Sequence, residues 1–600
     1  MKIVKLLFDL LTPSERRTLY LLFVSVFLMA GMQVASVASI MPFLSVAADP
    51  SSVQENVYLS WAFDTLGFTD PHSFLVALGV GALTMLVVSN ALIALTNWAM
   101  YHYAWGRNHS LSHRLLTSYL HYPYEYFLTH NGAELRKNVL EEVKEIVRDM
   151  IRPGLRGTAK AVMALSIIGF LVFMDPVVAL IVASVLGAAY VGIYFVMRSR
   201  IDAYGTHRVQ ENTRRYQFVS EALSGIKEVK LRGKETAFLH QYAEPSKQYS
   251  WYQAQYRFVK ELPRYVLEAV AFGGIILIAV YLVAVQESIR HVIPMLGLYA
   301  FAGYRLMPAL QKAFRAAANL QYHSAALEML RDNLKPHPET QSAPKRDRDG
   351  NSRTFHRLDD RLVLDDVHYT YPDADTPAIS GLSLDIPART TVGFVGKTGS
   401  GKTTTIDLIL GLLHPQSGFI SVDGIPLHEG VLSAWQQDIG YVPQHIHLSD
   451  DTVAQNIAFG VPREQIDMDA VRDAARRAHI HDFVRSELPH QWSTRVGEQG
   501  VRLSGGQRQR IGIARSLYHN PSVLVFDEAT SALDQDTEAQ VMQAIYELEH
   551  NHTMIIIAHR LSTVRRADNI VMLEHGRKVG EGSYQELSNR HEKFQEMAFS

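Results

Sequence analysis

Long apolar runs occupy the first half of the chain and stop near residue 315. A helix needs about 20 apolar residues to cross a bilayer, and runs of this length predict six membrane spans. We place these spans at 19–44, 74–98, 157–174, 177–197, 265–285 and 291–310. The pair Asp175–Pro176 lies inside one unusually long run and predicts a short turn between two helices. The pattern therefore predicts an all-α membrane domain over residues 1–332.

After residue 332 the pattern changes twice. Residues 333–360 are polar and contain prolines, serines and mixed charges, which predicts a linker. From 361 to 600, short apolar strands such as 391–395 and 523–527 alternate with helical patterns. This alternation predicts an α/β domain with a largely parallel sheet.

Lysine and arginine placement predicts how the spans are oriented. The loop 45–73 has no lysine or arginine, whereas the loops 99–156 and 198–264 have many. Because cytoplasmic loops carry an excess of these residues, we expect both termini in the cytoplasm of a multi-pass, bacterial-type plasma (inner) membrane protein. The two basic loops are helix-rich by pattern, with turning points near Tyr126–Gly132 and Ser220–Gly233.

Two short segments leave alternatives open. Residues 2–12 have helical apolar spacing and two lysines, so they form either a helix on the inner membrane surface or the start of the first span. Residues 51–68 mix polar and large apolar side chains, which fits an amphipathic helix at the outer surface or an ordered loop.

Composition excludes several kinds of chemistry. The chain has no cysteine, which excludes disulfides, thiolate zinc sites, cysteine-ligated iron–sulfur clusters and a cysteine nucleophile. The formal net charge is −2, so no global attraction to nucleic acid is expected, and we predict no nucleic-acid partner.

The stretch GKTGSGKTT at 396–404 matches the phosphate-binding loop pattern between a predicted strand and a predicted helix. Backbone N–H groups and the helix N-terminus favour bound phosphates. Lys402 is expected on the outer phosphates of ATP and Thr403 on Mg²⁺. The candidate nucleotide-binding residues of this loop are Gly396, Lys397, Thr398, Gly399, Ser400, Gly401, Lys402, Thr403 and Thr404.

The stretch VLVFDEATSALD at 523–534 is an apolar strand that ends in two acids. A carboxylate at the end of a strand beside a phosphate loop can orient Mg²⁺, which we assign to Asp527. The adjacent Glu528 is the candidate general base for the attacking water. The alternative is that both acids simply end the strand.

Between these stretches lies LSGGQ, at 503–507. With it, the second half of the chain resembles the nucleotide-binding domain of ATP-binding cassette (ABC) transporters. The resemblance implies that Ser504, Gly505, Gly506 and Gln507 contact nucleotide bound to the opposite subunit, and hence a homodimer with two ATP sites. The resemblance also implies that Tyr371 stacks on adenine and that Gln444 senses Mg²⁺ and the attacking water. It implies that Glu498 contacts the membrane part, that Asp534 ends the loop between paired domains and that His559 contacts the γ-phosphate.

The order of the two halves resembles exporter-type ABC proteins, in which 124–135 and 220–235 match coupling helices. Several stretches resemble the PglK-like lipid-linked oligosaccharide flippases: 40–51, 122–131, 304–309 and 553–563. This resemblance implies an ATP-driven flippase that moves a polyprenyl-pyrophosphate glycan from the inner to the outer leaflet. The alternatives are an exporter of lipid, peptide or another hydrophobic compound, and a regulatory or channel-like ABC protein. Intact Glu528 and His559 disfavour the last of these.

Two arginines in the last two predicted spans are candidates for contacting such a diphosphate. Arg305 lies inside the last apolar run, and Arg264 lies at the start of the fifth. A cation in hydrocarbon is costly and usually faces a cavity, a partner or water, and the planar guanidinium suits phosphate. The alternative for each is a nearby acid, such as Glu268 beside Arg264, or contact with the inner interface.

Overall fold

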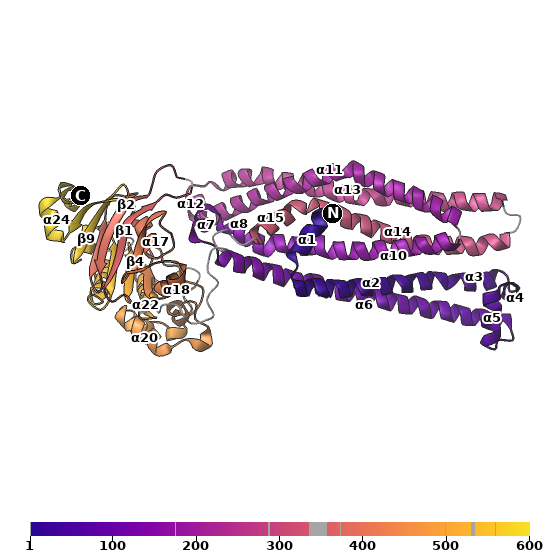
Figure 1. The fold of residues 1–600 in the computed structure, drawn as a ribbon, viewed down its shortest axis with the longest axis horizontal. Helices are drawn as coiled ribbons and strands as arrows, with labels where there is room; N and C mark the ends of the chain where they lie inside the picture. Colours follow the sequence, from indigo (N-terminus) through magenta and orange to yellow (C-terminus); the bar gives the residue numbers. More distant parts are fainter. Residues whose placement is uncertain are drawn as a thin grey trace. The chain divides into compact units, whose positions relative to one another are not determined.

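The structure is a computed structural model that describes residues 2–174, 176–285, 289–334, 357–372, 374–497, 500–529, 535–558 and 560–599. The chain divides into two compact units. The first comprises 1–122 and 127–337, and the second comprises 123–126 and 338–600. The first unit is helical and the second contains the sheets (Figure 1). The predicted turn at Asp175 and most of the predicted linker lie outside the described residues.

Long helices build the first unit. They are α2 (Pro13–Ala38) with its continuation α3 (Ile40–Ala48), α6 (Pro71–Leu120), α10 (Arg152–Met174), α11 (Pro176–Ser224), α13 (Glu235–Val285) and α14 (Ile289–Tyr322). Among the described residues, three helical stretches are long and apolar enough to cross a membrane: 13–48, 71–120 and 132–174. The first three predicted spans fall in these stretches. The other three predicted spans fall in α11, α13 and α14, where many side chains lie outside the description.

Several of these helices are much longer than a bilayer requires. Helices α6, α11 and α13 have 50, 49 and 51 residues. At a rise of 1.5 Å per residue each spans about 75 Å, against a hydrocarbon core of about 30 Å. The helix-rich character predicted for the two basic loops is therefore confirmed. Short helices lie at both predicted turning points, α7 (Tyr124–Thr129) and α12 (Ile226–Leu231).

Local sequence signals start the first two long helices. Thr12 caps α2, and its capping box with Glu15 satisfies N–H groups at both positions, while Pro13 occupies the first turn. Asp70 caps α6 by accepting from Ser73 N at 3.1 Å, and Pro71 again follows the cap. Each of these two apolar runs is therefore preceded by a polar capping residue that fixes where the helix begins.

The two segments with open alternatives are both helical. Residues 2–12 contain α1 (Lys2–Leu10), whose Leu10 carbonyl accepts from Arg114 Nη1 at 2.6 Å. Residues 51–68 form two short helices, α4 (Ser52–Glu55) and α5 (Val57–Thr65). Helix α5 buries Leu59 but exposes Trp61. The segment is therefore neither one amphipathic helix nor a loop.

Buried charges join two of the long helices outside the predicted spans. The stretch 132–174 is one continuous helix made of α8 (Gly132–Lys137), η1 (Asn138–Glu142), α9 (Val143–Glu145), η2 (Ile146–Ile151) and α10, with η1 and η2 wound as wide π-type turns. Arg208 of α11 is fully buried and forms an ion pair with Glu145. Lys137 Nζ lies 3.3 Å from Glu142 Oε1 and donates to Thr213 Oγ1 at 2.8 Å. These contacts fix α11 against the π-type segment.

The second unit contains two sheets. Six strands form one sheet in the order β10-β9-β3-β8-β7-β6, and all neighbours are parallel except β9 and β10. The largely parallel sheet predicted from the sequence is confirmed. Its strands are β3 (Thr391–Val395), β6 (Ile439–Val442), β7 (Val523–Asp527), β8 (Thr553–Ile557), β9 (Asn569–Glu574) and β10 (Arg577–Gly582).

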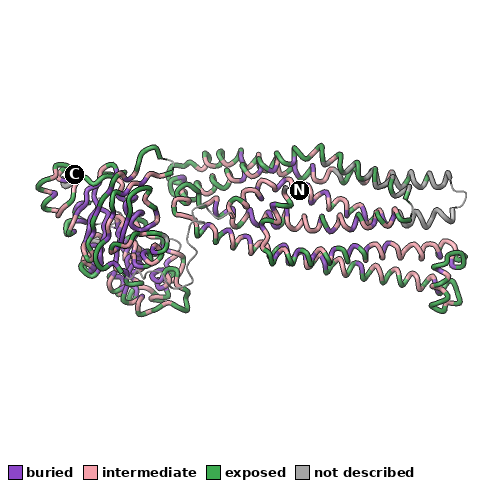
Figure 2. The backbone as a smooth tube through the Cα atoms, in the orientation of Figure 1, coloured by how far each residue is buried: buried purple, intermediate pink, exposed green. Residues whose placement is uncertain are grey.

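A second, antiparallel sheet has the order β2-β1-β4-β5 and was not predicted. Its strands are β1 (Arg361–Tyr369), β2 (Ile379–Pro387), β4 (Ser417–Val422) and β5 (Ile425–Pro426). Strands β3 and β8 are buried at every position because apolar clusters cover both faces of the parallel sheet. Buried backbone gathers in the interior of the second unit, with exposed backbone around it (Figure 2). Two helices matter for the site, α17 (Lys402–Ile409) and α22 (Gly505–Leu517).

Candidate functional site

The phosphate loop leaves the carboxyl end of β3 and runs into α17. Gly396 and Gly401 have φ of 153° and 102°, and a Cβ on Gly396 would lie 2.3 Å from Leu573 O, so only glycine fits. Lys397, Thr398 and Gly399 form the exposed tip of the loop. Ser400 Oγ is buried and has no hydrogen-bond partner among the described residues. A loop with spare donors at a helix N-terminus fits a bound phosphate chain.

Lys402 lies at the centre of this loop. Its Nζ donates to the carbonyls of Gly396 at 2.8 Å and Lys397 at 3.1 Å. Burial lowers the pKa of Lys402, and the nearby charges of Glu528 and Asp527 oppose this shift. The fold therefore brings the loop lysine within the electrostatic reach of both acids that end β7.

Next to Lys402, the hydroxyls of Thr403 and Thr404 differ in exposure. Thr403 is exposed at the start of α17, as a metal-binding hydroxyl must be, whereas Thr404 is buried. Thr404 Oγ1 lies 3.1 Å from the hydroxyl of Tyr371. Burial raises the pKa of Tyr371, so its hydroxyl keeps its proton. The predicted adenine-stacking tyrosine is thus held against the helix that begins at the phosphate loop.

The two acids at the end of β7 have different surroundings. Asp527 Oδ2 accepts from the Tyr441 hydroxyl at 3.4 Å. Glu528 has a φ of 49°, a left-handed conformation that costs a non-glycine residue about 1–3 kcal/mol. Glu528 Oε2 accepts from Gln444 Nε2 at 2.6 Å. The strained turn therefore aims the candidate general base at the predicted water-sensing glutamine.

Asp407 is a buried acid near Asp527 that the sequence reasoning missed. It lies on α17, and burial together with the charge of Asp527 raises its pKa to about 6. Asp407 is therefore a titratable group within the electrostatic reach of the acid that is expected to hold Mg²⁺. Its position in α17 resembles that of any polar helix residue, so no sequence pattern marked it.

The LSGGQ stretch has a separate place in the unit. Ser504 caps α22, and a capping box joins it to Gln507, with Ser504 N donating to Gln507 Oε1 at 2.8 Å. Gly505 is exposed in the first turn and Gly506 is buried. No hydrogen bond between described residues joins this turn to the phosphate loop. The predicted residues Glu498, Asp534 and His559 lie outside the described residues.

A short segment from the first predicted turning point, Pro123–Tyr126, belongs to the same unit as this site. Within it, Glu125 Oε1 accepts from the Tyr369 hydroxyl at 2.7 Å. Tyr369 packs edge-on against Tyr371, with ring centroids 5.1 Å apart. Burial raises the pKa of Tyr369, which keeps it a donor. This contact joins Glu125 to the tyrosine pair beside the phosphate loop. The resemblance of 124–135 to a coupling helix marked the segment, but not this residue.

The two candidate arginines of the membrane unit differ. Arg264 Nε donates to Glu268 Oε1 at 2.7 Å, so for this residue the alternative of a nearby acid is what the structure shows. Arg305 is half-buried, and its guanidinium carbon lies 5.5 Å from the ring centroid of Phe301. The buried Nε of Arg305 has no hydrogen-bond partner among the described residues.

Arg305 belongs to a group of four cations on α10 and α14, which we term the cationic face: Arg156, Lys160, Arg305 and Lys312. Lys160 lies in the field of the other three, and Lys312 in that of Arg156 and of Arg315, which is itself paired with Glu261. The two helices approach closely because Gly157 leaves no room for a Cβ, which would lie 2.1 Å from Ala316 Cβ. Within the described part of the unit, none of the four has a carboxylate at salt-bridge distance. Sequence reasoning found only Arg305, because Arg156 and Lys160 come from a distant helix and Lys312 lies beyond the last predicted span.

Both halves of the chain match known families. The ABC transporter transmembrane region matches residues 8–316, and the ABC transporter family matches residues 379–531. The first match covers the six predicted spans, and the second covers the phosphate loop, the LSGGQ stretch and both acids.

Relatives and a solved structure agree with these matches. The chain is 31% identical over 488 residues to the ATP-dependent lipid A-core flippase of Saccharophagus degradans, covering 80% of this chain and 79% of the relative. It is 34% identical over 466 residues to the protein of that name from Thiobacillus denitrificans, covering 77% and 76%. The structure of a bacterial Atm1-family ABC exporter with ATP bound superposes with a TM-score of 0.79 at 23% identity, covering 97% of each chain.

Proposed function

The chain belongs to the ABC transporter family as an ATP-hydrolysing half-transporter with a multi-pass transmembrane region, and from this premise we propose that it flips an amphiphilic lipid with a phosphate-bearing head group. The observation that carries the proposal is the cationic face. Lys160 and Arg305 are half-buried in the predicted spans without a carboxylate partner among the described residues, and Arg156 and Lys312 add to the positive charge around them. Half-buried cations of this kind are costly unless an anion balances them. Phosphate on a lipid supplies that anion, and arginine can bind it with two parallel hydrogen bonds.

The names of the relatives and the sequence resemblance favour different cargoes of this class. The relatives reported above are named for lipid A-core, whereas the stretches resembling PglK-like proteins favour a polyprenyl-pyrophosphate glycan. Both are lipids, and the cationic face supports the feature we assign to the cargo, a phosphate near the lipid anchor. We also propose cytoplasmic termini, from the charge of the loops. Movement from the inner to the outer leaflet is proposed from the resemblance to exporter-type flippases.

Energy for this movement comes from the nucleotide-binding unit. We assign to Glu528 the role of general base on the attacking water and to Gln444 the role of holding that carboxylate, since the two are hydrogen-bonded. Thr403 and Asp527 are the residues that would hold Mg²⁺, which when bound neutralises phosphate charge. Tyr371 would stack on adenine, and Lys402 would bind the outer phosphates. No hydrogen bond between described residues joins Ser504 to the phosphate loop, which supports a homodimer in which each LSGGQ turn serves the other subunit.

Coupling between the units is proposed to run through Glu125. Its hydrogen bond to Tyr369 joins the first turning point to the tyrosine pair beside the nucleotide. A conformational change at the phosphate loop can therefore be transmitted to the segment Pro123–Tyr126.

The proposal is tested by reconstituting the full-length protein in liposomes with three labelled cargoes. These are a polyprenyl-pyrophosphate glycan, lipid A-core and a neutral glycolipid of similar size. We expect ATP-dependent flipping of a phosphate-bearing cargo and little flipping of the neutral one, with Glu528→Gln as the control that cannot hydrolyse. Equal flipping of the neutral glycolipid would contradict the proposed head-group chemistry, and the better of the two phosphate-bearing cargoes identifies the lipid.

A further inference from the structure

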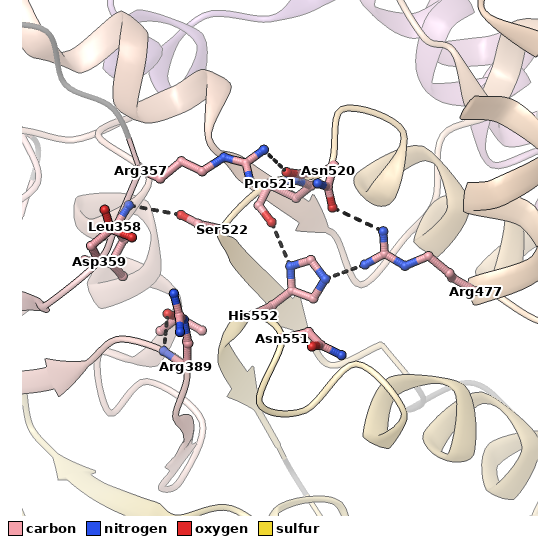
Figure 3. A pocket seen from close by; sticks show the side chains of 11 residues that line it. Arg357, Leu358, Asp359, Arg389, Arg477, Asn520, Pro521, Ser522, Asn551 and His552 are labelled. Atoms are coloured by element: carbon pink, nitrogen blue, oxygen red, sulfur yellow. Dashed lines mark hydrogen bonds between the residues drawn. The ribbon is translucent and has the colours of Figure 1, made fainter. Parts of the chain in front are cut away.

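A polar pocket lies at the opposite edge of the parallel sheet from the phosphate loop. Strands β3 and β7 carry candidate nucleotide-site residues just after their carboxyl ends, and with β8 between them they make three adjacent strands of the parallel sheet. Just before their amino ends they carry Arg389, His552 and Ser522, and all three residues line a pocket of about 410 Å³ (Figure 3). The residues of the nucleotide site contribute nothing to this pocket, so it is a separate site.

Three arginines from three parts of the unit line the pocket. Arg357 precedes β1, Arg389 lies between β2 and β3, and Arg477 ends α20 (Met468–Arg477). Figure 3 shows their side chains approaching the same space from different elements. The one carboxylate in the lining is that of the exposed Asp359, so the lining has a net positive charge.

Hydrogen bonds hold two of these arginines in place. Arg357 Nη2 donates to Asn520 O at 2.9 Å, and Arg477 Nη1 donates to Asn520 Oδ1 at 3.3 Å. Arg477 also donates to Nε2 of the buried His552, whose Nδ1 then donates to Pro521 O at 2.7 Å. With Nε2 accepting, this histidine is neutral and adds no charge. The pocket wall is therefore preorganised, and its charge comes from the guanidinium groups.

Few acids compete for these guanidinium groups. Arg357 Nε lies 3.9 Å from Asp438 Oδ1, but the Asp438 carboxylate already accepts from Ser522 N at 3.0 Å and from the Ser522 hydroxyl. The side chain of Arg389 makes no hydrogen bond or ion pair among the described residues; only its backbone N–H donates, to Thr553 Oγ1 at 2.8 Å. Arg389 is thus a free guanidinium at the mouth of a pocket whose other donors are fixed.

We propose that this pocket, formed by Arg357, Arg389, Arg477 and the amino ends of β3, β7 and β8, binds a small phosphorylated anion. One guanidinium group can bind a phosphate through two parallel hydrogen bonds. The volume of this mostly polar pocket lies at the lower end of the range for small-molecule sites. The shared chemistry is a phosphate group, either as free orthophosphate or as the phosphate of a small ester or of a lipid head group. The site gives the unit a second place at which phosphate is sensed, on the far edge of the sheet from the hydrolysed nucleotide.

The test is thermal unfolding of the full-length protein in detergent in the Lys402→Ala background, which weakens phosphate binding at the phosphate loop. Orthophosphate, glycerol 3-phosphate and short-chain phosphatidic acid are titrated at matched ionic strength. We expect at least one probe to raise the midpoint, and the probe with the lowest Kd identifies the source. Arg389→Gln and Arg357→Gln should each raise that Kd at least tenfold.

Arg476→Gln is the matched control, because Arg476 is the exposed neighbour of Arg477 and lies outside the pocket lining. It should leave the Kd unchanged, and Arg389→Gln in the otherwise unaltered chain should leave basal ATP hydrolysis unchanged. The proposal is overturned if no probe raises the midpoint, if Arg389→Gln and Arg357→Gln both keep the full response, or if Arg476→Gln loses as much of it.

Discussion

The two units of this protein bring positive charges together in different ways. In the nucleotide-binding unit one loop of nine contiguous residues, 396–404, supplies backbone N–H groups and Lys402, and glycine conformations shape the site. In the membrane unit the charges are side chains from two helices far apart in the sequence, Lys160 on α10 and Arg305 on α14. A site built from backbone depends on local sequence, whereas a site built from two helix faces depends on how the helices pack.

The largest expected effect lies in the nucleotide-binding unit. Replacing Glu528 by Gln keeps the side chain's size and its neighbour Gln444 but removes the proton acceptor. General-base catalysis contributes about 10²–10⁴-fold, so steady-state ATP hydrolysis should fall by at least about a hundredfold while ATP still binds. The measurement is phosphate release together with nucleotide binding on the purified protein. Hydrolysis at the parental rate would refute the role given to Glu528.

The next effect is on stability and tests the buried acid beneath the site. The folded pKa of Asp407 is about 6, above its ordinary value of 3.8, so the folded state binds the proton more tightly. This tighter proton binding stabilises the folded state fully below pH 3.8, and the stabilisation is lost as the pH rises through 6. By pH 8 the loss in the free energy of unfolding amounts to about 3 kcal/mol. Asp407→Asn cannot ionise, so it should raise the unfolding midpoint by several degrees at pH 8.

The difference between Asp407→Asn and the parent should close as the pH is lowered toward 4, in nucleotide-free and Mg²⁺-free buffer. Asp469→Asn is the control, because Asp469 is an exposed acid on α20 paired with Arg472. An Asp407→Asn midpoint that differs from the parent equally at both pH values would show that the carboxyl does not titrate in this range.

Sequence reasoning succeeded where function depends on local pattern. The phosphate loop, the strand that ends in Asp527 and Glu528, and the parallel sheet were all predicted, because strand, loop and helix follow one another directly. The long helices beyond the membrane were predicted for the same reason, since an apolar or helical period is visible in a single segment.

It failed where residues meet only after folding. Asp407, Glu125 and Lys160 look like ordinary polar helix residues, and their importance comes from Asp527, Tyr369 and Arg305, which lie on other elements. The arginine pocket at the far edge of the sheet also escaped detection, because its arginines come from a linker end, a turn and a helix end. The antiparallel sheet was missed because its two local pairs, β1 with β2 and β4 with β5, are joined only by the long-range pairing of β1 with β4.

Arg305 and Arg264 offer a matched pair within the membrane unit. Arg305 lies inside a predicted span and Arg264 directly precedes one, but Arg264 is paired with Glu268, and Arg305 lies in the cationic face. A hydrogen bond to a charged group is worth about 1.5–3 kcal/mol, so Arg305→Ala should slow flipping of the phosphate-bearing cargo about tenfold or more. Lys160→Ala should act in the same direction, and Arg264→Ala should have little effect.

Basal ATP hydrolysis in these three variants should remain near the parental rate, because the nucleotide site is unchanged. Flipping is measured in liposomes with equal protein per vesicle. If Arg264→Ala slowed flipping as much as Arg305→Ala, the distinction between a paired and an unpaired arginine would be wrong. If neither variant had an effect, the cationic face would not contact the cargo.

The smallest effect tests whether the hydrogen bond between Glu125 and Tyr369 carries information about cargo. Tyr369→Phe removes a buried hydroxyl 2.7 Å from Glu125 Oε1 and keeps the ring contact with Tyr371. The loss of about 1 kcal/mol should lower the stimulation of ATP hydrolysis by cargo a few-fold without weakening ATP binding. Tyr518→Phe is the control, since its hydroxyl accepts from Asp467 N at 3.0 Å elsewhere in the unit. Equal loss of stimulation in both variants would point to general destabilisation, whereas loss in Tyr369→Phe alone would place the coupling at this bond.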